Sequence, residues 1–230
     1  AGGDHWGVLE QASTLVDTSI RQRALYLMVR FTPDEGGGVW APRGLGDPSP
    51  YVQRRCVKAL SERRNDPGAL VHLRDHALQK NRDPYSRGLA ALNLAVQGDN
   101  SLLPSLLVDI QESTHHSESA PLALAAHAMG DASAATALEA ALQKGDFPLE
   151  VDFFSSLGRH PTSNLAEALT KGLPFIEEEL HLPIAVSLLA IEHTLGESIV
   201  LEALQNEDIE RQHEALDFLR LSTAPARLKL

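Results

Sequence analysis

The residues best suited to chemistry in this chain are histidines. His72 and His76 are four residues apart on a predicted helix, with Asp75 beside them. That spacing would present two imidazole nitrogens on one helix face, where they could bind a metal ion. A complete site needs a third ligand, and Leu73 stands where the His-Glu-x-x-His motif requires Glu. The other interpretation is two solvated histidines, and we predict no metal site.

Other motifs of enzymes are missing or incomplete. The Gly36-Gly37-Gly38 run is not followed by Lys-Ser or Lys-Thr, so it lacks the signature of a phosphate-binding loop, and there is no Gly-x-Ser-x-Gly elbow. His115-His116 lies in a polar stretch that we interpret as a linker. Because no nucleophile can be paired with a base, we predict a non-catalytic protein without a cofactor.

The composition favours helices and argues against a general nucleic-acid binder. Hydrophobic residues make up 43% of the 230 residues but aromatic residues only 5%, so Leu and Ala must provide most of the packing. The formal net charge is −11, whereas phosphate backbones are held mainly by Lys and Arg. The charge is uneven, net +3 up to Val96 and net −14 from Gln97 onward. Such asymmetry can orient a partner or an assembly, and a solvated acidic surface is its commoner meaning.

The sequence gives only weak indications of the cellular compartment and of membrane association. Cys56 is the single cysteine, so no intrachain disulfide forms, and its position on an apolar stripe predicts a core residue. A lone cysteine suits a reducing compartment, which makes the cytoplasm the default expectation. The chain starts at Ala1 without Met, and removal of a signal would also leave that start, so export stays open. No apolar run reaches the length of a membrane helix, and we expect no membrane insertion.

The elements that must position any site form a repeat. An anchor residue opens each copy, followed at +3 by an aliphatic residue, at +4 often by Arg, and at +7 and +10 by small or apolar residues. The spacings between anchors are 32, 34, 35, 28, 35 and 25 residues, which leaves room for two helices in each period. The anchors are Asp17, Ser49, Asp83, Glu118, Asp146, His181 and Asn206. We predict a second helix after each anchor, and first helices over 4–16, 68–79, 102–111, 132–144, 163–176 and 199–204.

One interval departs from this rule. Between residues 33 and 50 the chain is rich in Gly and Pro, which leaves at most a turn or two of helix where the second repeat should begin. We expect an irregular loop there, carrying Trp40 and Arg43. Loops on rigid scaffolds often carry function, so these two residues are candidates for partner binding. The alternative is a degenerate repeat packed down by Trp40.

The pattern that these copies share resembles that of HEAT repeats. The residues that carry the resemblance are Asp83-Pro84-Tyr85-Ser86-Arg87-Gly88-Leu89-Ala90 and Asp17…Ile20-Arg21…Ala24. The closest similarity is to the bacterial lyase-like HEAT class. In that family the turn Asp and the second-helix Arg form a ladder between neighbouring repeats. The resemblance therefore implies structural roles for Asp17, Arg21, Asp83 and Arg87. The ladder is incomplete, because Gln53 stands where Arg is expected.

The resemblance also implies alternatives with catalytic roles. Phycobilin lyase subunits are similar to this repeat class, and nothing in the residues marks a bilin site. HEAT-type di-iron hydroxylases carry several His-Glu pairs, whereas only His213-Glu214 has that order here. Alkylpurine DNA glycosylases of similar fold use a basic groove with tryptophans, which an acidic chain with two Trp residues does not match. A chromophore lyase-like subunit or a metal-dependent hydroxylase-like enzyme therefore stays the alternative.

A partner would dock on the concave face that second helices line in a HEAT-like stack. The outward positions there are about +5 and +9 from each anchor, which gives a groove that is basic at its start and apolar in its middle. A shallow apolar trough with charged ends suits a peptide or helix, and the alternative is that neighbouring helices bury it. Arg54 and Lys58, one helical turn apart, form a basic patch with the nearby Arg55, Arg63 and Arg64. This patch is predicted to accept an acidic segment of a partner, such as the C-terminal half of another copy of the chain. The predicted partner-binding residues are Tyr26, Trp40, Arg43, Arg54, Lys58 and His127.

These observations lead to one prediction of fold and function. The fold class is all-α, a right-handed α-solenoid of about six to seven HEAT-like helical pairs in a single domain over residues 1–230. The function is a protein-interaction or scaffold module that binds a protein or peptide partner, with no nucleic acid and no cofactor.

Overall fold

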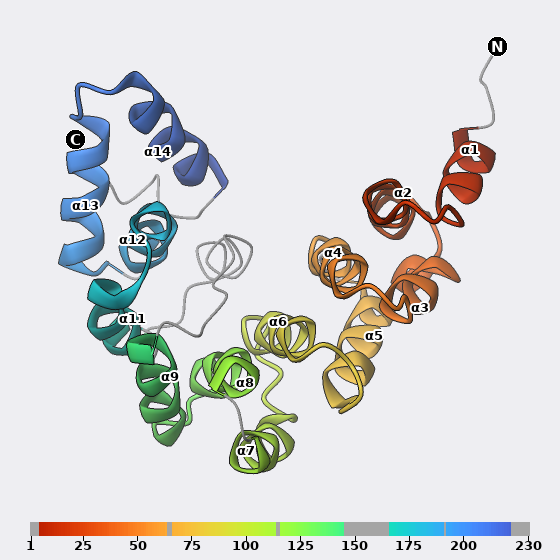
Figure 1. The fold of residues 1–230 in the computed structure, drawn as a ribbon, viewed down its shortest axis with the longest axis horizontal. Helices are drawn as coiled ribbons and strands as arrows, with labels where there is room; N and C mark the ends of the chain where they lie inside the picture. Colours follow the sequence, from red (N-terminus) through yellow and green to blue (C-terminus); the bar gives the residue numbers. More distant parts are fainter. Residues whose placement is uncertain (1–4, 64–65, 114–115, 145–165, 191, 222–230) are drawn as a thin grey trace. The chain divides into compact units, whose positions relative to one another are not determined.

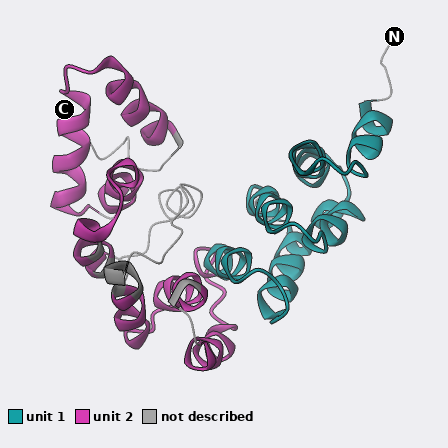
Figure 2. Ribbon diagram, in the orientation of Figure 1, with its two compact units in different colours: residues 1–94 teal, residues 95–230 magenta. Residues whose placement is uncertain are grey.

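The structure is a computed structural model that describes residues 5–63, 66–113, 116–144, 166–190 and 192–221. Those residues form thirteen α-helices and three short 3-10 helices, with no strand among them, so the all-α prediction is confirmed. The helices fall into two compact units, residues 1–94 (unit 1) and 95–230 (unit 2), each of which is described by itself (Figures 1 and 2). Unit 1 contains the net positive part of the sequence and unit 2 the strongly acidic part.

Unit 1 is built from helices that contact near neighbours in the sequence. Helix α2 packs against α1, α3 and α4, and α4 packs against α5. The core between α2 and α4 is aliphatic, with Leu25, Met28, Val52 and Cys56 fully buried. Its elements are α1 (His5–Ala12), α2 (Thr18–Phe31), η1 (Glu35–Gly37), α3 (Trp40–Leu45), α4 (Pro50–Ser61), α5 (Pro67–Leu78) and α6 (Pro84–Ala95), whose last residue falls in unit 2.

Unit 2 also joins helices that are close in sequence. Helix α8 lies between α7 and α9, and α12 contacts α11, α13 and α14. Residues 122–126 and 184–190 form two apolar runs whose residues are all buried, as expected for helices that are apolar on nearly every side. The elements are α7 (Leu103–Glu112), α8 (His116–Ala128), α9 (Ser133–Lys144), α11 (Ala166–Gly172), η3 (Leu173–Phe175), η4 (Glu178–Leu180), α12 (His181–Ala190), α13 (Thr194–Leu204) and α14 (Ile209–Leu221). The helix predicted after Asp146, and the start of the one predicted over 163–176, lie outside the described residues.

The helices begin where capping chemistry predicts. The Asp17 carboxylate accepts hydrogen bonds from the backbone N–H of Ser19 and Ile20, at 2.8 and 3.1 Å, and so caps α2. Pro50 and Pro67 stand in the first turns of α4 and α5, where a missing N–H costs nothing. The anchors Asp17, Ser49 and Asp83 therefore mark starts of second helices, as the repeat predicts.

The interval predicted as a loop contains short helices. Trp40 and Arg43 lie on the six-residue α3 rather than in irregular chain, because Trp40, Ala41, Arg43 and Leu45 tolerate a helix and Pro42 falls in its first turn. The helix ends at Gly46. Gly44 lies directly against the Cys56 sulfur, so α3 approaches α4 more closely than any side chain at position 44 would allow.

Arg63 and Asp66 connect the end of α2 and the Gly-rich segment after it to the start of α5. The Arg63 guanidinium donates to the carbonyl oxygens of Val29, in the last turn of α2, and Thr32, just after it, at 3.0 and 2.8 Å, and pairs with Asp66 at 2.7 Å. Asp66 also accepts the backbone N–H of Gly36 at 2.9 Å. Burial alone would raise the pKa of Asp66, but the hydrogen bonds from Arg63, Gly36 and Ala69 outweigh it and lower that pKa. Arg63 is therefore a structural residue, not part of an exposed basic patch.

Candidate functional site

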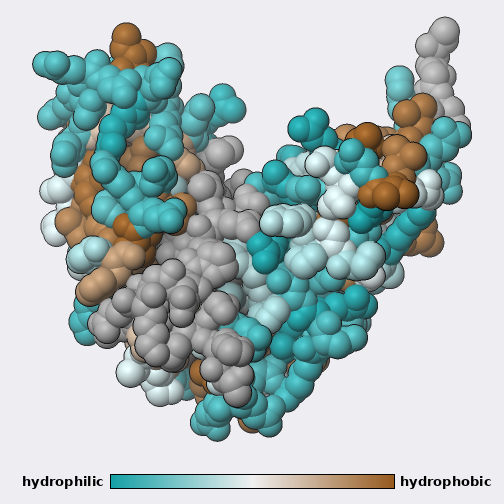
Figure 3. Space-filling view, in the orientation of Figure 1, coloured by the Kyte–Doolittle hydropathy of each residue, from teal (hydrophilic) through white to brown (hydrophobic). Residues whose placement is uncertain are grey.

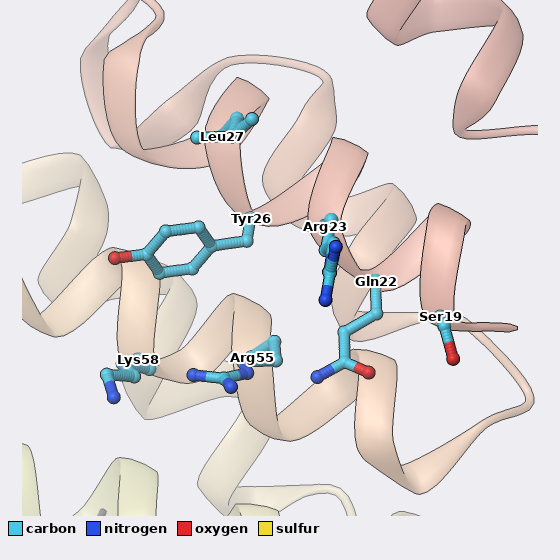
Figure 4. Close-up of a pocket in the computed structure, with 7 residues that line it drawn as sticks. All are labelled: Ser19, Gln22, Arg23, Tyr26, Leu27, Arg55 and Lys58. Atoms are coloured by element: carbon cyan, nitrogen blue, oxygen red, sulfur yellow. The ribbon is translucent and has the colours of Figure 1, made fainter.

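A groove with a volume of about 490 Å³ lies between α2 and α4 of unit 1 (Figure 4). Helix α2 contributes five side chains at i, i+3, i+4, i+7 and i+8, which places them on one face of that helix. Helix α4 contributes two side chains, three residues apart, on the opposite wall. The lining residues, called here the α2–α4 groove, are Ser19, Gln22, Arg23, Tyr26, Leu27, Arg55 and Lys58.

The α2–α4 groove is cationic with an apolar end. Arg23, Arg55 and Lys58 carry its charge, and no acidic residue lines it. Tyr26 and Leu27 supply an aromatic ring and an aliphatic side chain. Carboxylates are attracted to such a concentration of positive charge, and the ring and the leucine provide surface for an apolar side chain. The groove can therefore bind an acidic segment that also carries an apolar residue.

A carboxylate of the chain itself contacts one of the side chains that line the groove. The Tyr26 hydroxyl donates to Glu62 Oε2 at 2.8 Å, and Arg30 forms an ion pair with the same oxygen at 2.9 Å. Burial raises the pKa of Tyr26, and the hydrogen bond to Glu62 raises it further. The tyrosine ring is thus held in place by Glu62 and Arg30 together.

Two of the predicted partner-binding residues meet in this groove. Tyr26 and Lys58 both line it, although they are far apart in the sequence. Trp40 and Arg43 do not line it; they lie on α3, where the Arg43 guanidinium is 5.8 Å from the centre of the Trp40 ring. Arg55, predicted only as a neighbour in the basic patch, lines the groove, and so do Arg23 and Leu27, which were not predicted. The buried stripe of α2, Ala24, Leu25, Met28 and Val29, could have indicated the opposite face.

The prediction that Arg54 faces the groove is wrong. Its guanidinium forms a two-point ion pair with Asp83, at 3.0 and 3.2 Å, and lies 4.1 Å from the centre of the Tyr85 ring. The Arg54 side chain is only 17% exposed. The ion pair and the aromatic ring turn it toward the start of α6, and the neighbouring Arg55 faces the groove instead.

The Arg54–Asp83 pair is one of two ion pairs that join successive helical segments of unit 1, called here the ladder. Arg21 forms the other pair, with Asp47 at 2.7 and 3.1 Å. Gln53, at the position expected for Arg, donates to the Asp47 carbonyl at 2.8 Å and so keeps a contact there. Asp17 caps α2, and Arg87 donates to the Ala77 carbonyl at 2.9 Å. Of the four predicted ladder residues, Arg21 and Asp83 thus form ion pairs, with Asp47 and Arg54, whereas Asp17 and Arg87 make other contacts.

Replacing Arg54 and Arg55 in turn separates the ladder from the groove. We expect Arg54→Ala to lower the free energy of unfolding by about 2 kcal/mol, because it leaves Asp83 partly buried without its partner. Arg55→Ala is expected to cost less than about 1 kcal/mol, because its side chain lies in an open groove. Urea unfolding followed by circular dichroism measures both. Equal costs would contradict the assignment of Arg54 to the ladder and Arg55 to the groove.

The predicted middle of the concave trough is buried. His127 is 7% exposed, and its Nδ1 lies 3.0 Å from the Asp131 carbonyl oxygen. Gly88, Leu92, Ala123, Val186 and Ala190, also predicted to face outward, are buried. Helices α8 and α12 are apolar on nearly every side and are enclosed by their neighbours, so these positions offer no surface to a partner. The prediction that His127 contacts a partner is corrected accordingly.

No family model matches the chain, and no curated protein or solved structure is significantly similar to it.

The histidines suggested by spacing are placed apart from any metal-binding group. His76 faces the core, with Nε2 2.8 Å from Ser86 Oγ, and His72 is half-buried. No group of three or more His, Cys, Asp or Glu residues that could hold a metal ion was found in the part of the chain that the structure describes. His115 falls outside that part. Among the described helices, none has the length and apolar character needed to cross a membrane.

Proposed function

We propose that the chain is a protein-binding module that holds an acidic segment of a protein partner in the α2–α4 groove. The observation that carries the proposal is the convergence of Arg23, Arg55 and Lys58 around an aromatic and aliphatic surface, with no acidic residue in the lining. This is the start of the predicted basic groove, with Arg55 in place of Arg54. The role is one of binding, and no step of chemistry is assigned to these residues.

The free energies of the available contacts indicate what the partner segment must contain. An exposed ion pair contributes only about 0.2–1 kcal/mol, so three such pairs give about 1–3 kcal/mol. A micromolar complex requires about 8 kcal/mol, so charge alone does not hold a partner. Burying one aliphatic side chain against Tyr26 and Leu27 adds about 1.5–3 kcal/mol. The preferred ligand therefore combines carboxylates with at least one large apolar residue.

We further propose that the helical pairs form a right-handed, HEAT-like α-solenoid of about six to seven pairs. Contacts between elements near in sequence support it within each unit, because stacked repeats contact their neighbours. The ion pairs Arg21–Asp47 and Arg54–Asp83, which join residues 26 and 29 positions apart, also support it. In this arrangement the groove lies between the second helices of the first two repeats.

Charge reversal in the groove tests the proposed binding. The probe is a short fluorescent peptide rich in Glu and Leu, and binding is followed by fluorescence anisotropy. We expect the double variant Arg55→Glu, Lys58→Glu to weaken binding at least about tenfold, because two attractive contacts become repulsive. Binding to the unchanged protein should also weaken as salt is raised, since the contacts are partly exposed.

Arg43→Glu is the matched control for that experiment. It reverses an exposed charge in the same unit, but on α3 and outside the groove. We expect it to leave the peptide affinity within about twofold of the original, since screening weakens charges that are not in contact. If Arg43→Glu weakened binding and the groove variant did not, the site would belong to the Trp40–Arg43 surface and the proposal would be wrong. Circular dichroism confirms that each variant is folded.

A further inference from the structure

We propose that the acidic segment held by unit 1 is helix α14 of a second copy of this chain, so that copies associate head to tail. This inference rests on the proposed function and names its partner. It depends on two helix faces, one in each unit, that match in spacing and are opposite in charge.

The first face is the outer side of α2, which forms one rim of the groove. Ile20 and Leu27 are seven residues apart and remain 44% and 38% exposed. Arg23, exposed between them, lines the groove, and Arg30 follows Leu27 by three residues. Figure 3 shows hydrophobic surface over α1 and α2. Two exposed aliphatic side chains flanked by arginines form a stripe that the packing of unit 1 does not use.

The second face is the outer side of α14. Ile209 and Leu216 are also seven residues apart and are 64% and 53% exposed. Glu210 and Asp217 follow these two residues directly, and both are exposed. The inner side of the same helix is already occupied, because Ala215 and Leu219 are buried in the core formed with α12 and α13. The exposed apolar residues of α14 are therefore additional to the residues that hold it in unit 2.

The two faces complement each other over two helical turns. Seven residues span about 10.5 Å of helix, so both aliphatic pairs can meet when the helices lie side by side. Arginines then face carboxylates along the seam, as charged positions do beside the apolar seam of a coiled coil. The net charges of +3 and −14 for the two parts of the sequence favour the same encounter.

The expected assembly follows from the use of two different surfaces. A groove that binds a helix face from elsewhere on the chain makes a heterologous contact, which gives open chains or closed rings, the smallest ring having two copies. Burial of four aliphatic side chains and a few ion pairs predicts modest affinity, so the extent of association should depend on protein concentration and on salt.

Sedimentation velocity over a range of protein concentrations tests the inference. We expect the unchanged chain to form larger species as its concentration rises, and to dissociate in high salt. A groove variant, Arg23→Glu with Arg55→Glu, and a tail variant, Ile209→Ser with Leu216→Ser, should each stay monomeric. The altered groove and the altered α14 are then both acidic and do not attract each other. Mixed in equal amounts, they should form a heterodimer that grows no further, because one intact groove then meets one intact α14.

Each other outcome contradicts a defined part of the inference. A chain that stays monomeric at every concentration overturns it, and so does association that both variants retain. If the variants stay monomeric but their mixture does not associate, α14 and the groove are not partners. The tail variant keeps the groove, so its binding of the Glu- and Leu-rich peptide is measured in parallel. Peptide binding without self-association would reject only the second copy as partner, whereas loss of both would reject the proposed function as well.

Discussion

Alanine in place of Gly196 is expected to lower the free energy of unfolding by about 3 kcal/mol, at the upper end of the cost of overpacking a core. Gly196 lies in the first turn of α13, directly against α12. A Cβ atom there would lie against the backbone nitrogen of Leu189 and 2.6 Å from the carbonyl oxygen of Ala185. Both are backbone atoms of a buried helix, so no side-chain rotation relieves the contact, and the two helices must move apart.

Gly98 is the matched control for Gly196. It also belongs to unit 2, but a Cβ at this position would meet nothing within 4 Å. Its φ of 82° is the left-handed region, so Gly98→Ala is expected to cost only about 1–2 kcal/mol. Urea unfolding followed by far-ultraviolet circular dichroism compares the two variants. If Gly196→Ala cost no more than Gly98→Ala, the close approach of α12 and α13 would be contradicted.

Acid is expected to destabilise unit 1 through His76, by about 3 kcal/mol between pH 7 and pH 4. The imidazole is 1% exposed, and its Nε2 lies 2.8 Å from Ser86 Oγ. Burial, helped by the charges of Arg82 and Arg87, lowers the pKa of His76 from 6.5 to about 4. The unfolded chain therefore takes up the proton first, so stability is full above pH 6.5 and is lost as the pH falls toward 4.

His76→Gln tests this pH dependence, because glutamine keeps a polar group near Ser86 but does not titrate. Unfolding free energies measured in urea at pH 7 and pH 4 should differ less for this variant than for the unchanged chain, by about 2–3 kcal/mol. Ser86→Ala is the matched control: it removes the hydrogen bond but leaves the imidazole buried, and so should keep the pH dependence. An identical pH dependence in His76→Gln would assign the acid sensitivity to other groups.

The helices could be predicted from the sequence because their signals are local. The anchors Asp17, Ser49 and Asp83 stand one residue before α2, α4 and α6. Pro50, Pro67 and Pro84 are the first residues of α4, α5 and α6. Side-chain capping and the fixed φ of proline act within a few residues, so neighbours in space do not change them. The interior position of the two apolar runs follows equally directly from their lack of a polar face.

The groove could be predicted only in part, because its side chains depend on contacts between repeats. Arg54 and Arg55 are adjacent in the sequence, and which of them faces the groove is decided by Asp83 and Tyr85, some thirty residues later. His127 has the spacing of an outward position, but the helices around α8 bury it. A count of positions from an anchor gives the face of a helix to about one residue, which is the difference between a ladder residue and a groove residue.

The contact between Gly36 and Gly68 restricts how this chain can change. A Cβ on Gly36 would come within 2.8 Å of the Gly68 carbonyl carbon, and one on Gly68 within 2.9 Å of the Gly36 nitrogen. The space for a side chain at each glycine is thus limited by main-chain atoms of the other, and no side-chain substitution removes those atoms. A larger residue at one of these glycines therefore cannot be accommodated by substituting the other. A larger residue at either position requires a longer or differently shaped segment between α2 and α3.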